Sequence, residues 1–371
     1  MDNEQRIGQE EAAVGSLLGT AVGDALGLPY EGISRFRLMR MRPKVERYHF
    51  LFGRGMLSDD AEHALITAQA LIECRGDADS FSRILTRRLK YWLLGLPAGI
   101  GTATFKALLK AAFGYKPGDT GVYSAGNGPA MRAPIIGVYC GQDRKLLKQL
   151  IFASSRITHT DPKAAYGSLA VAQAAYMATF GHVESDDYLR EIKELLGEEG
   201  TELTALLGKA ASSANLGQTP FDFALDIGCK KGVGGYIYHT VPVVIQVWLN
   251  HQNDYIKGIQ EIIACGDDTD TTAAILGGII GARVGEAGIP GKWIKGIWER
   301  PRNVKWMREV GLRVASSAKG RIVEPVRKAR WQILPRNFLF FWVLMAHMFR
   351  RLFPPYAFRK KQKKKNNEKA T

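Results

Sequence analysis

The sequence has few cysteines and almost no strand-like alternation, and both shortages limit what this chain can be. Its four cysteines, Cys74, Cys140, Cys229 and Cys265, lie far apart in 371 residues and form no CxxC pair. That spacing argues against a disulfide framework and a cysteine-ligated zinc site, and it indicates a reducing compartment. The first five residues are polar and acidic. We therefore expect no signal peptide and a cytoplasmic protein.

Alternation of apolar and polar residues, the pattern of a half-buried strand, occurs only at 47–51. Elsewhere, apolar residues recur at helical spacing, and hydrophobic residues make up 46% of the chain. We predict an all-α fold, with one large domain of orthogonally packed helices over residues 8–320. The predicted helices cover 14–25, 61–74, 80–93, 102–112, 144–158, 161–180, 186–196, 202–214, 219–228, 236–250, 254–264, 272–284 and 292–299.

Positive charge is concentrated in residues 321–371, which we treat as a basic C-terminal extension. This segment holds 14 of the 51 Lys and Arg residues but two of the 36 acidic ones, so it carries +12 of the net +15. The preceding domain is nearly neutral. The basic balance of the chain is therefore a property of the extension and says little about what the domain binds.

Within the extension, residues 338–349 are apolar on every side. Twelve residues fall short of the roughly 20 that span a bilayer. A basic run follows at 359–365. Two interpretations stay open: a peripheral anchor on an anionic membrane surface, or a segment that folds back on the domain beside solvated lysines. Nucleic-acid binding is not expected, because no second basic face or stacking platform accompanies the run.

The densest chemical pattern lies at 267–272, where Asp267, Asp268 and Asp270 alternate with three threonines ahead of an apolar, glycine-rich helix. One acid at a helix start is ordinary capping, but three exceed that need. Buried carboxylates repel one another unless a cation neutralises them, and oxygen ligands suit magnesium, calcium or manganese. The alternative is a solvated acidic turn that caps the helix.

Four further polar motifs accompany this one: 19–31 with Asp24 and Glu31, 58–63 with Ser58, Asp59 and Asp60, 126–134 with Asn127 and Arg132, and 158–162 with His159. Glu62 stands where a capping box would place it, but capping does not explain two adjacent acids before a buried helix. The glycine-rich turn at 126–128 suits close approach by a phosphate or sugar. A lone histidine such as His159 is more often structural than catalytic.

In chain order, the stretches GTAVGDALGLPYE, SDDAEHAL, GNGPAMRAP, THTDP and GDDTDTTAAILGGIIGARVG resemble the ADP-ribosylglycohydrolase family over residues 10–300. The resemblance implies an all-helical domain with a binuclear site for two magnesium ions, with manganese as the alternative metal. It implies metal-dependent hydrolysis of the glycosidic bond between ADP-ribose and a protein side chain or small acceptor. The partner would be an ADP-ribosylated protein or an ADP-ribose derivative.

The resemblance also assigns site residues. The implied metal ligands are Ser58, Asp59, Asp60, Asp268, Asp270 and Thr271; the catalytic residues are Glu31, Asp59, Asp60 and Asp268; the substrate-binding residues are Asp24, Gly126, Asn127, Gly128, Arg132 and His159. The sequence departs from the family pattern at Ala61, His63 and Asp267. These departures motivate two alternatives: a catalytically weak ADP-ribose-binding module, held at a membrane surface by the tail, and a membrane-localised scaffold with a vestigial site.

Overall fold

The computed structural model describes residues 6–41, 45–50 and 52–352. These residues form α-helices joined by short 3-10 turns and loops, and they contain isolated β-bridges but no β-sheet. The helices are α1 (Gln9–Gly27), α2 (Arg35–Met41), α3 (Asp59–Cys74), α4 (Ala78–Leu93), α5 (Thr102–Ala112), α6 (Ala133–Cys140), α7 (Arg144–Arg156), α8 (Pro162–Ala178), α9 (Ser185–Leu196), α10 (Thr201–Asn215), α11 (Pro220–Asp226), α12 (Ile237–Asn250), α13 (Tyr255–Ala264), α14 (Thr269–Val284), α15 (Gly291–Gly296), α16 (Val304–Ala318) and α17 (Ile333–Leu352).

The predicted all-α fold is confirmed, with one local correction. The strand expected at 47–51 does not form over its described residues: Phe50 instead bridges Arg54 across a tight turn. Three helices, α2, α6 and α16, lie outside every predicted range. All eight residues of α6 are buried, so no polar face marks it in the sequence as an amphipathic helix.

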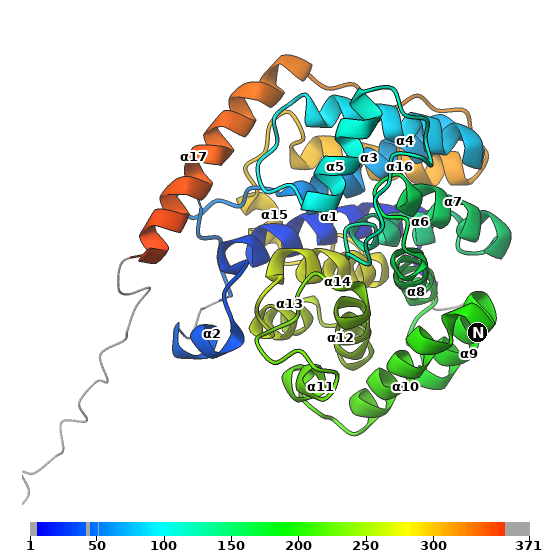
Figure 1. The fold of residues 1–371 in the computed structure, drawn as a ribbon, viewed down its shortest axis with the longest axis vertical. Coiled ribbons are helices and arrows are strands. Elements are labelled where there is room, and N and C mark those ends of the chain that lie inside the picture. The colour runs from blue at the N-terminus through cyan, green and yellow to red at the C-terminus, as the bar shows by residue number, and fades with distance from the viewer. Residues whose placement is uncertain (1–5, 42–44, 51, 353–371) are drawn as a thin grey trace, which may run out of the picture.

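Helices α1 and α14 cross the centre of the molecule side by side and antiparallel (Figure 1). Almost every residue of both helices is buried. Four small-residue positions bring the two backbones together. A Cβ atom added at Gly15, Gly19 or Gly23 would lie 2.1–2.2 Å from a backbone carbonyl oxygen of α14, and at Gly27 it would lie 2.3 Å from one. Only glycine permits this approach.

This helix pair positions the site, because the end of α1 lies beside the start of α14. Thr269, in the first turn of α14, donates its hydroxyl to Gly27 O at 2.9 Å. Tyr255 of α13 donates to Gly19 O at 2.6 Å and fixes the middle of α1. The polar residues that follow α1 and those that begin α14 are therefore held next to each other.

Gly19→Ala is expected to lower the free energy of unfolding by about 3 kcal/mol, because the new methyl group cannot fit between two backbones without separating the helices. Gly208→Ala in α10 is the matched control, since a Cβ atom there meets nothing within 4 Å. That control is expected to raise the free energy of unfolding by about 0.5 kcal/mol. Urea unfolding of both variants measures the difference, and equal effects at the two sites would contradict the close packing of α1 on α14.

Helix α17 runs along the outside of the domain (Figure 1) and includes the apolar segment 338–349. One face of α17 is buried through Arg336, Asn337, Phe340 and His347. Phe340 packs with Leu28, Phe50 and Met56 in a small apolar cluster separate from the main core. The segment thus folds back on the domain through one face, while the basic run 359–365 lies outside the described residues.

Candidate active site

Two acidic motifs that are distant in the sequence meet at the starts of α3 and α14. Ser58 caps α3, since its Oγ accepts from Asp60 N at 3.2 Å, and it also donates to Asp60 Oδ2 at 3.1 Å. Across the gap, Thr271 Oγ1 of α14 donates to the same Asp60 Oδ2 at 3.3 Å. The predicted convergence of 58–60 with 268–271 is therefore present.

The loops around these helix starts are tied together by backbone hydrogen bonds. Asp267 N donates to Ile33 O at 2.9 Å and Gly32 N donates to Asp267 O at 2.7 Å. Asp268 N donates to Val233 O at 3.0 Å. Asp267 itself adopts a left-handed φ of 71°, a conformation that aspartate and asparagine tolerate better than most residues. The loop before α14 is thus fixed to the segments after α1 and before α12.

A pocket of about 310 Å³ opens above the two motifs. It is lined by Glu31, Asp59, Asp60, Gly101, Thr102, Ala103, Thr104, Ser124, Gly126, Asn127, Gly128, Met131, His159, Gly235, Asp268, Asp270 and Thr271. No lysine or arginine belongs to this lining, although five carboxylates do. The pocket is therefore strongly acidic at its base, with small polar residues and glycines around it.

Most predicted site residues line this pocket: Glu31, Asp59, Asp60, Gly126, Asn127, Gly128, His159, Asp268, Asp270 and Thr271. Three predicted residues, Asp24, Arg132 and Ser58, are buried and do not belong to this lining. Asp24 is fully buried, and its Oδ2 accepts from Ser58 N at 2.9 Å and from Ala61 N at 3.2 Å. The placement of Asp24 therefore indicates that it holds the start of α3 in position, rather than contacting a ligand.

Arg132 was expected to reach a substrate phosphate, but it is fully buried behind the pocket. Its Nη2 donates to Ser154 O at 3.1 Å and to Thr158 Oγ1 at 3.0 Å. Burial lowers the pKa of Arg132 to about 9. Because Thr158 Oγ1 in turn lies 2.9 Å from His159 Nδ1, Arg132 acts on the pocket through the position of His159.

His159 forms part of the pocket wall against the glycine-rich turn. A Cβ atom at Gly126 would lie 2.8 Å from His159 Nε2, and one at Gly128 would lie 3.1 Å from His159 Cε1. Glycine at both positions leaves space for the imidazole. Burial, with repulsion from Arg132, lowers the pKa of His159 to about 3, so the ring is neutral at pH 7.

Asn127 connects this turn to the second acidic motif. Its Nδ2 donates to Asp268 Oδ2 at 2.6 Å and to Thr240 Oγ1 at 3.0 Å. The amide thus fixes the orientation of the Asp268 carboxylate from outside α14. Sequence reasoning placed Asn127 in the site, but as a ligand contact and not as a partner of Asp268.

Several pocket residues were not predicted from the sequence: Gly101, Thr102, Ala103, Thr104, Ser124, Met131 and Gly235. Three of them begin α5, whose N-cap is Gly101. The only signal in the sequence was a glycine followed by a helical pattern, and that pattern does not say which pocket a helix start faces.

His63 and Glu62 point away from the pocket. The buried His63 ring packs edge-on against Trp92, with centroids 4.4 Å apart. Glu62 does not form the expected capping box; its carboxylate accepts from Trp92 Nε1 and pairs with Arg302 and Arg336. His63 therefore introduces no titratable group into the acidic base of the pocket.

The carboxylates of the two motifs are crowded and desolvated. Burial, followed by repulsion from neighbouring carboxylates, raises the pKa values of Asp59, Asp60 and Asp270 well above the ordinary range. Burial also raises the pKa of Asp268 and takes that of Asp24 to about 7. These groups are therefore costly to ionise together.

Glu31 lies at the edge of the pocket and joins this acidic group. The residue is solvent-exposed, but its carboxyl group faces Asp268 and Asp270. Desolvation there, followed by repulsion from Asp268, raises the pKa of Glu31. The backbone of Glu31 is held from outside by Arg351 of α17, whose Nη1 donates to Glu31 O at 2.8 Å.

The chemistry of the donor set fits a hard divalent cation. The donors are carboxylate and hydroxyl oxygens, and Asp270 Oδ1 is buried without a hydrogen-bond partner. As the side chains stand, no three or more His, Cys, Asp or Glu in the described ranges are already arranged to hold a metal ion. Cation binding would relieve the repulsion that raises these pKa values.

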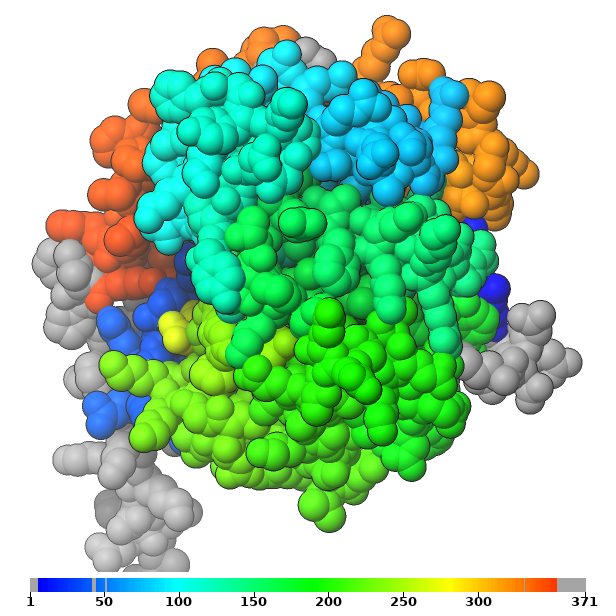
Figure 2. Space-filling view, turned by 45° about the vertical axis from the view of Figure 1, so that its right-hand side comes forward, coloured from blue at the N-terminus to red at the C-terminus, as the bar shows by residue number. Residues whose placement is uncertain are grey.

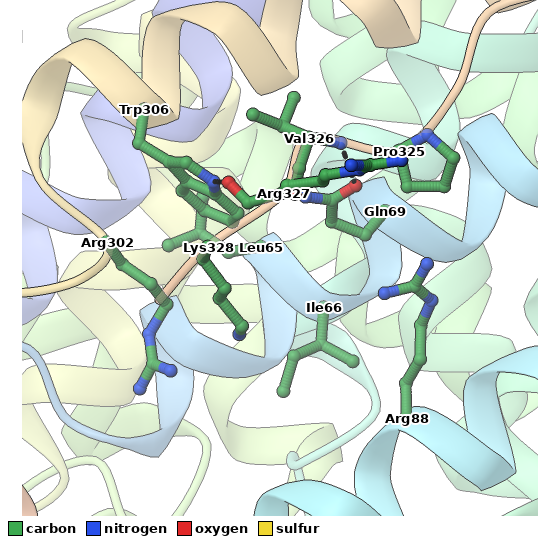
Figure 3. A pocket seen from close by; sticks show the side chains of 10 residues that line it. All are labelled: Leu65, Ile66, Gln69, Arg88, Arg302, Trp306, Pro325, Val326, Arg327 and Lys328. Carbon is green, nitrogen blue, oxygen red and sulfur yellow. Dashed lines mark hydrogen bonds between the residues drawn. The ribbon is translucent and has the colours of Figure 1, made fainter. Parts of the chain in front are cut away.

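A second pocket, of about 360 Å³, lies on another side of α3 (Figure 3). Basic and apolar side chains line it, among them Arg88, Arg327, Lys328 and Trp306. It contains no carboxylate. This pocket lacks donors for a hard cation and lacks a general base, so the acidic pocket is the candidate active site.

This chain is similar to known proteins over most of its length. The family model for ADP-ribosylglycohydrolase matches residues 5–323. ADP-ribosyl-[dinitrogen reductase] glycohydrolase of Rhodospirillum rubrum is 26% identical over 294 residues, which cover 76% of this chain and 89% of that protein. ADP-ribosylhydrolase ARH3 of Gallus gallus is 25% identical over 323 residues, which cover 75% of this chain and 87% of that protein.

A solved structure, an ADP-ribosylglycohydrolase-related protein complex, shares the fold with a TM-score of 0.61 and 23% sequence identity. The superposition covers 84% of this chain and 99% of the solved chain. The matched family residues include both acidic motifs and the pocket, and they end before α17. Because the family match spans most of the sequence, this chain belongs to the ADP-ribosylglycohydrolase family of hydrolases.

Proposed function

We propose that this protein hydrolyses the glycosidic bond between ADP-ribose and a protein side chain or small acceptor, with bound magnesium. The observation that carries the proposal is the meeting of Asp59 and Asp60 with Asp268, Asp270 and Thr271 in one acidic pocket whose lining contains no lysine or arginine. Family membership supports the hydrolysis of an ADP-ribose linkage. Family membership identifies neither the metal nor the acceptor, and both are part of our proposal.

The residues that would hold two magnesium ions are Ser58, Asp59, Asp60, Asp268, Asp270 and Thr271. Manganese prefers the same oxygen donors and is the alternative. When bound, such ions supply charge that polarises the ribose hydroxyls and lowers the pKa of a bound water. Ser58 Oγ and Thr271 Oγ1 both donate to Asp60 Oδ2, so these hydroxyls orient the carboxylate at the centre of the set.

Glu31 is the proposed general base. Its carboxyl group lies at the pocket edge beside Asp268, and its raised pKa makes its carboxylate form a stronger proton acceptor than that of an ordinary glutamate. In the proposed reaction, water attacks the anomeric carbon as its bond to the acceptor breaks. Glu31 accepts a proton from the water and returns it to the departing acceptor atom. Cleavage passes through a positively charged, oxocarbenium-like sugar, which the carboxylates at the base of the pocket stabilise.

The upper part of the pocket would receive the rest of the ADP-ribose. Gly126 and Gly128 present no side chain, and the neutral His159 ring packs behind them. Asn127 holds Asp268 while its own backbone N–H is bonded to Gly235 O at 2.9 Å. This arrangement fixes the distance between the glycine-rich turn and the acidic motif. In the proposed complex, one ribose and its phosphate occupy the space between them.

The proposal is tested by measuring free ADP-ribose released from arginine-linked and serine-linked protein and from O-acetyl-ADP-ribose. We expect release from at least one of these substrates with magnesium and none with a chelator. The substrate that reacts identifies the acceptor. ADP-ribose binding without release from any substrate would instead support the binding-module alternative.

Glu31→Gln is expected to lower kcat by about 100-fold with little change in KM, because the variant removes the base but retains the shape of the pocket edge. Glu198→Gln, an exposed substitution of the same chemistry, is the control and is expected to leave kcat unchanged. Magnesium binding by calorimetry separates the two roles of Glu31. Loss of metal binding in Glu31→Gln would show that this residue holds the cation and is not the base.

A further inference from the structure

The outward face of α17 carries a continuous apolar stripe that the hydrolase site does not use. Its members are Phe338, Phe341, Trp342, Met345, Met348 and Phe349, which are 44–67% exposed. Their spacing of three and four residues places them on one side of the helix. Soluble monomers rarely expose contiguous apolar surface of this kind unless it meets a partner or a membrane.

The opposite face of α17 fixes the helix flat against the domain. Arg336 Nε donates to Glu299 Oε2 at 3.0 Å, and Asn337 Nδ2 donates to Gly95 O at 2.7 Å. Near the other end, His347 Nε2 lies 2.8 Å from Pro29 O. In Figure 2 the residues of α17, coloured orange-red, form an outer edge of the molecule. The apolar stripe is therefore held outward along the length of the helix.

A membrane-spanning role does not fit α17. Among the described residues, one helical stretch, Gln9–Tyr30, is long and apolar enough to cross a bilayer, and it is buried in the core of the domain. Helix α17 contains Arg336, Arg350 and Arg351 and is fastened along its inner face. An orientation in the plane of a membrane surface remains, with the aromatic and methionine side chains entering the interface.

Positive charge surrounds the C-terminal end of the stripe. Arg350 and Arg351 lie in the last turn of α17. Residues 353–371 lie outside the described part of the chain, and their sequence contains seven Lys or Arg residues and one Glu. Helix α2 lies beside this end (Figure 1), where Arg37 Nη2 donates to Arg351 O at 3.0 Å. It adds exposed Arg40 and the exposed apolar residue Met39.

We infer that the outward face of α17, together with α2, is a peripheral binding surface for an anionic lipid bilayer. An apolar stripe beside the arginines of α2 and of the last turn of α17 matches the headgroup region in both polarity and charge. A second copy of this chain is a poorer occupant, because its own extension carries the same net +12 over 321–371 and would repel the first. The inference does not depend on catalysis, since it uses no pocket residue.

The test is co-sedimentation of the full chain with vesicles of phosphatidylcholine alone or of phosphatidylcholine with phosphatidylserine. We expect binding to the anionic vesicles at low salt and release at high salt. Trp342→Ser combined with Phe349→Ser is expected to weaken the partition coefficient by roughly tenfold or more, because each aromatic side chain loses its burial in the interface. Truncation is avoided because it would expose Leu28, Phe50 and Met56.

Leu216→Ser combined with Phe113→Ser is the matched control, since both residues are highly exposed but lie far from α17 in the chain. This control is expected to bind vesicles as the unchanged chain does. The thermal unfolding temperature of every variant is measured, and the single Trp342→Ser variant replaces the double one if the latter unfolds early. The inference is overturned if the unchanged chain stays in the supernatant with anionic vesicles, or if the control loses as much binding. It is also overturned if sedimentation velocity shows a dimer that the α17 variant dissociates.

Discussion

Asp270→Asn is expected to reduce ADP-ribose release by at least about 1,000-fold while making the metal-free protein more stable. The Asp270 carboxylate is a proposed magnesium ligand. A neutral amide binds magnesium poorly in its place because it lacks the negative charge. Burial, followed by repulsion from the carboxylates of Glu31, Asp60, Asp268 and Asp24, raises the pKa of Asp270 well above its ordinary range. The ionised form is therefore less stable in the folded chain than in the unfolded chain, and at pH 7 this penalty is present.

A neutral amide removes that penalty, so the variant should gain at least about 1 kcal/mol in unfolding free energy without metal. Added magnesium should raise the unfolding temperature of the unchanged protein and leave that of Asp270→Asn unaffected. Asp267→Asn is the matched control: it removes a carboxylate three positions earlier that is outside the pocket lining, and asparagine suits the left-handed φ of 71°. Equal loss of activity in both variants would contradict the assigned ligand set.

Arg336→Met is expected to lower the free energy of unfolding by about 3–5 kcal/mol, because it leaves buried carboxylates without their partner. Arg336 is buried and contacts Glu62 at 3.1 Å and Glu299 Oε2 at 3.0 Å. Its Nη2 also donates to Leu57 O at 2.5 Å, immediately before the capping residue of α3. The charge of Arg336 accounts, after that of Arg302, for the lowered pKa of Glu62.

The double variant Glu299→Gln with Arg336→Met should recover part of this loss, since it removes one unpaired charge as well. Urea unfolding of the single and double variants measures the recovery. Trp342→Ser, on the outward face of the same helix, should change stability by less than about 0.5 kcal/mol. A similar small effect for Arg336→Met would show that α17 is not anchored through this ion cluster.

The two central helices could be predicted because small residues recur along them, and small residues allow helices to pack closely. The small residues of 14–25 and 277–282 indicate two buried, tightly packed helices, and the structure adds that these two helices pack against each other. The acidic motifs at 58–60 and 268–271 could also be placed at helix starts, since capping residues and apolar periodicity mark those boundaries. Their convergence followed from the family resemblance and not from spacing alone.

The roles of Asp24 and Arg132 could not be predicted, because they depend on which way each side chain turns from its backbone. Both residues sit within motifs that do line the pocket, yet both are buried behind it. Similarly, residues 338–349 are apolar on all sides in the sequence. Only the packing of Phe340 and His347 against the domain separates an inward face of α17 from an outward one.

The measurement that tests the central claim most directly is a magnesium titration of the chelator-treated protein, followed by both calorimetry and release of free ADP-ribose. The account predicts that ADP-ribose release appears over the same magnesium range as saturable binding, and that Asp270→Asn shows neither. Undiminished release from chelator-treated protein, or saturable magnesium binding that survives in Asp270→Asn, would contradict it.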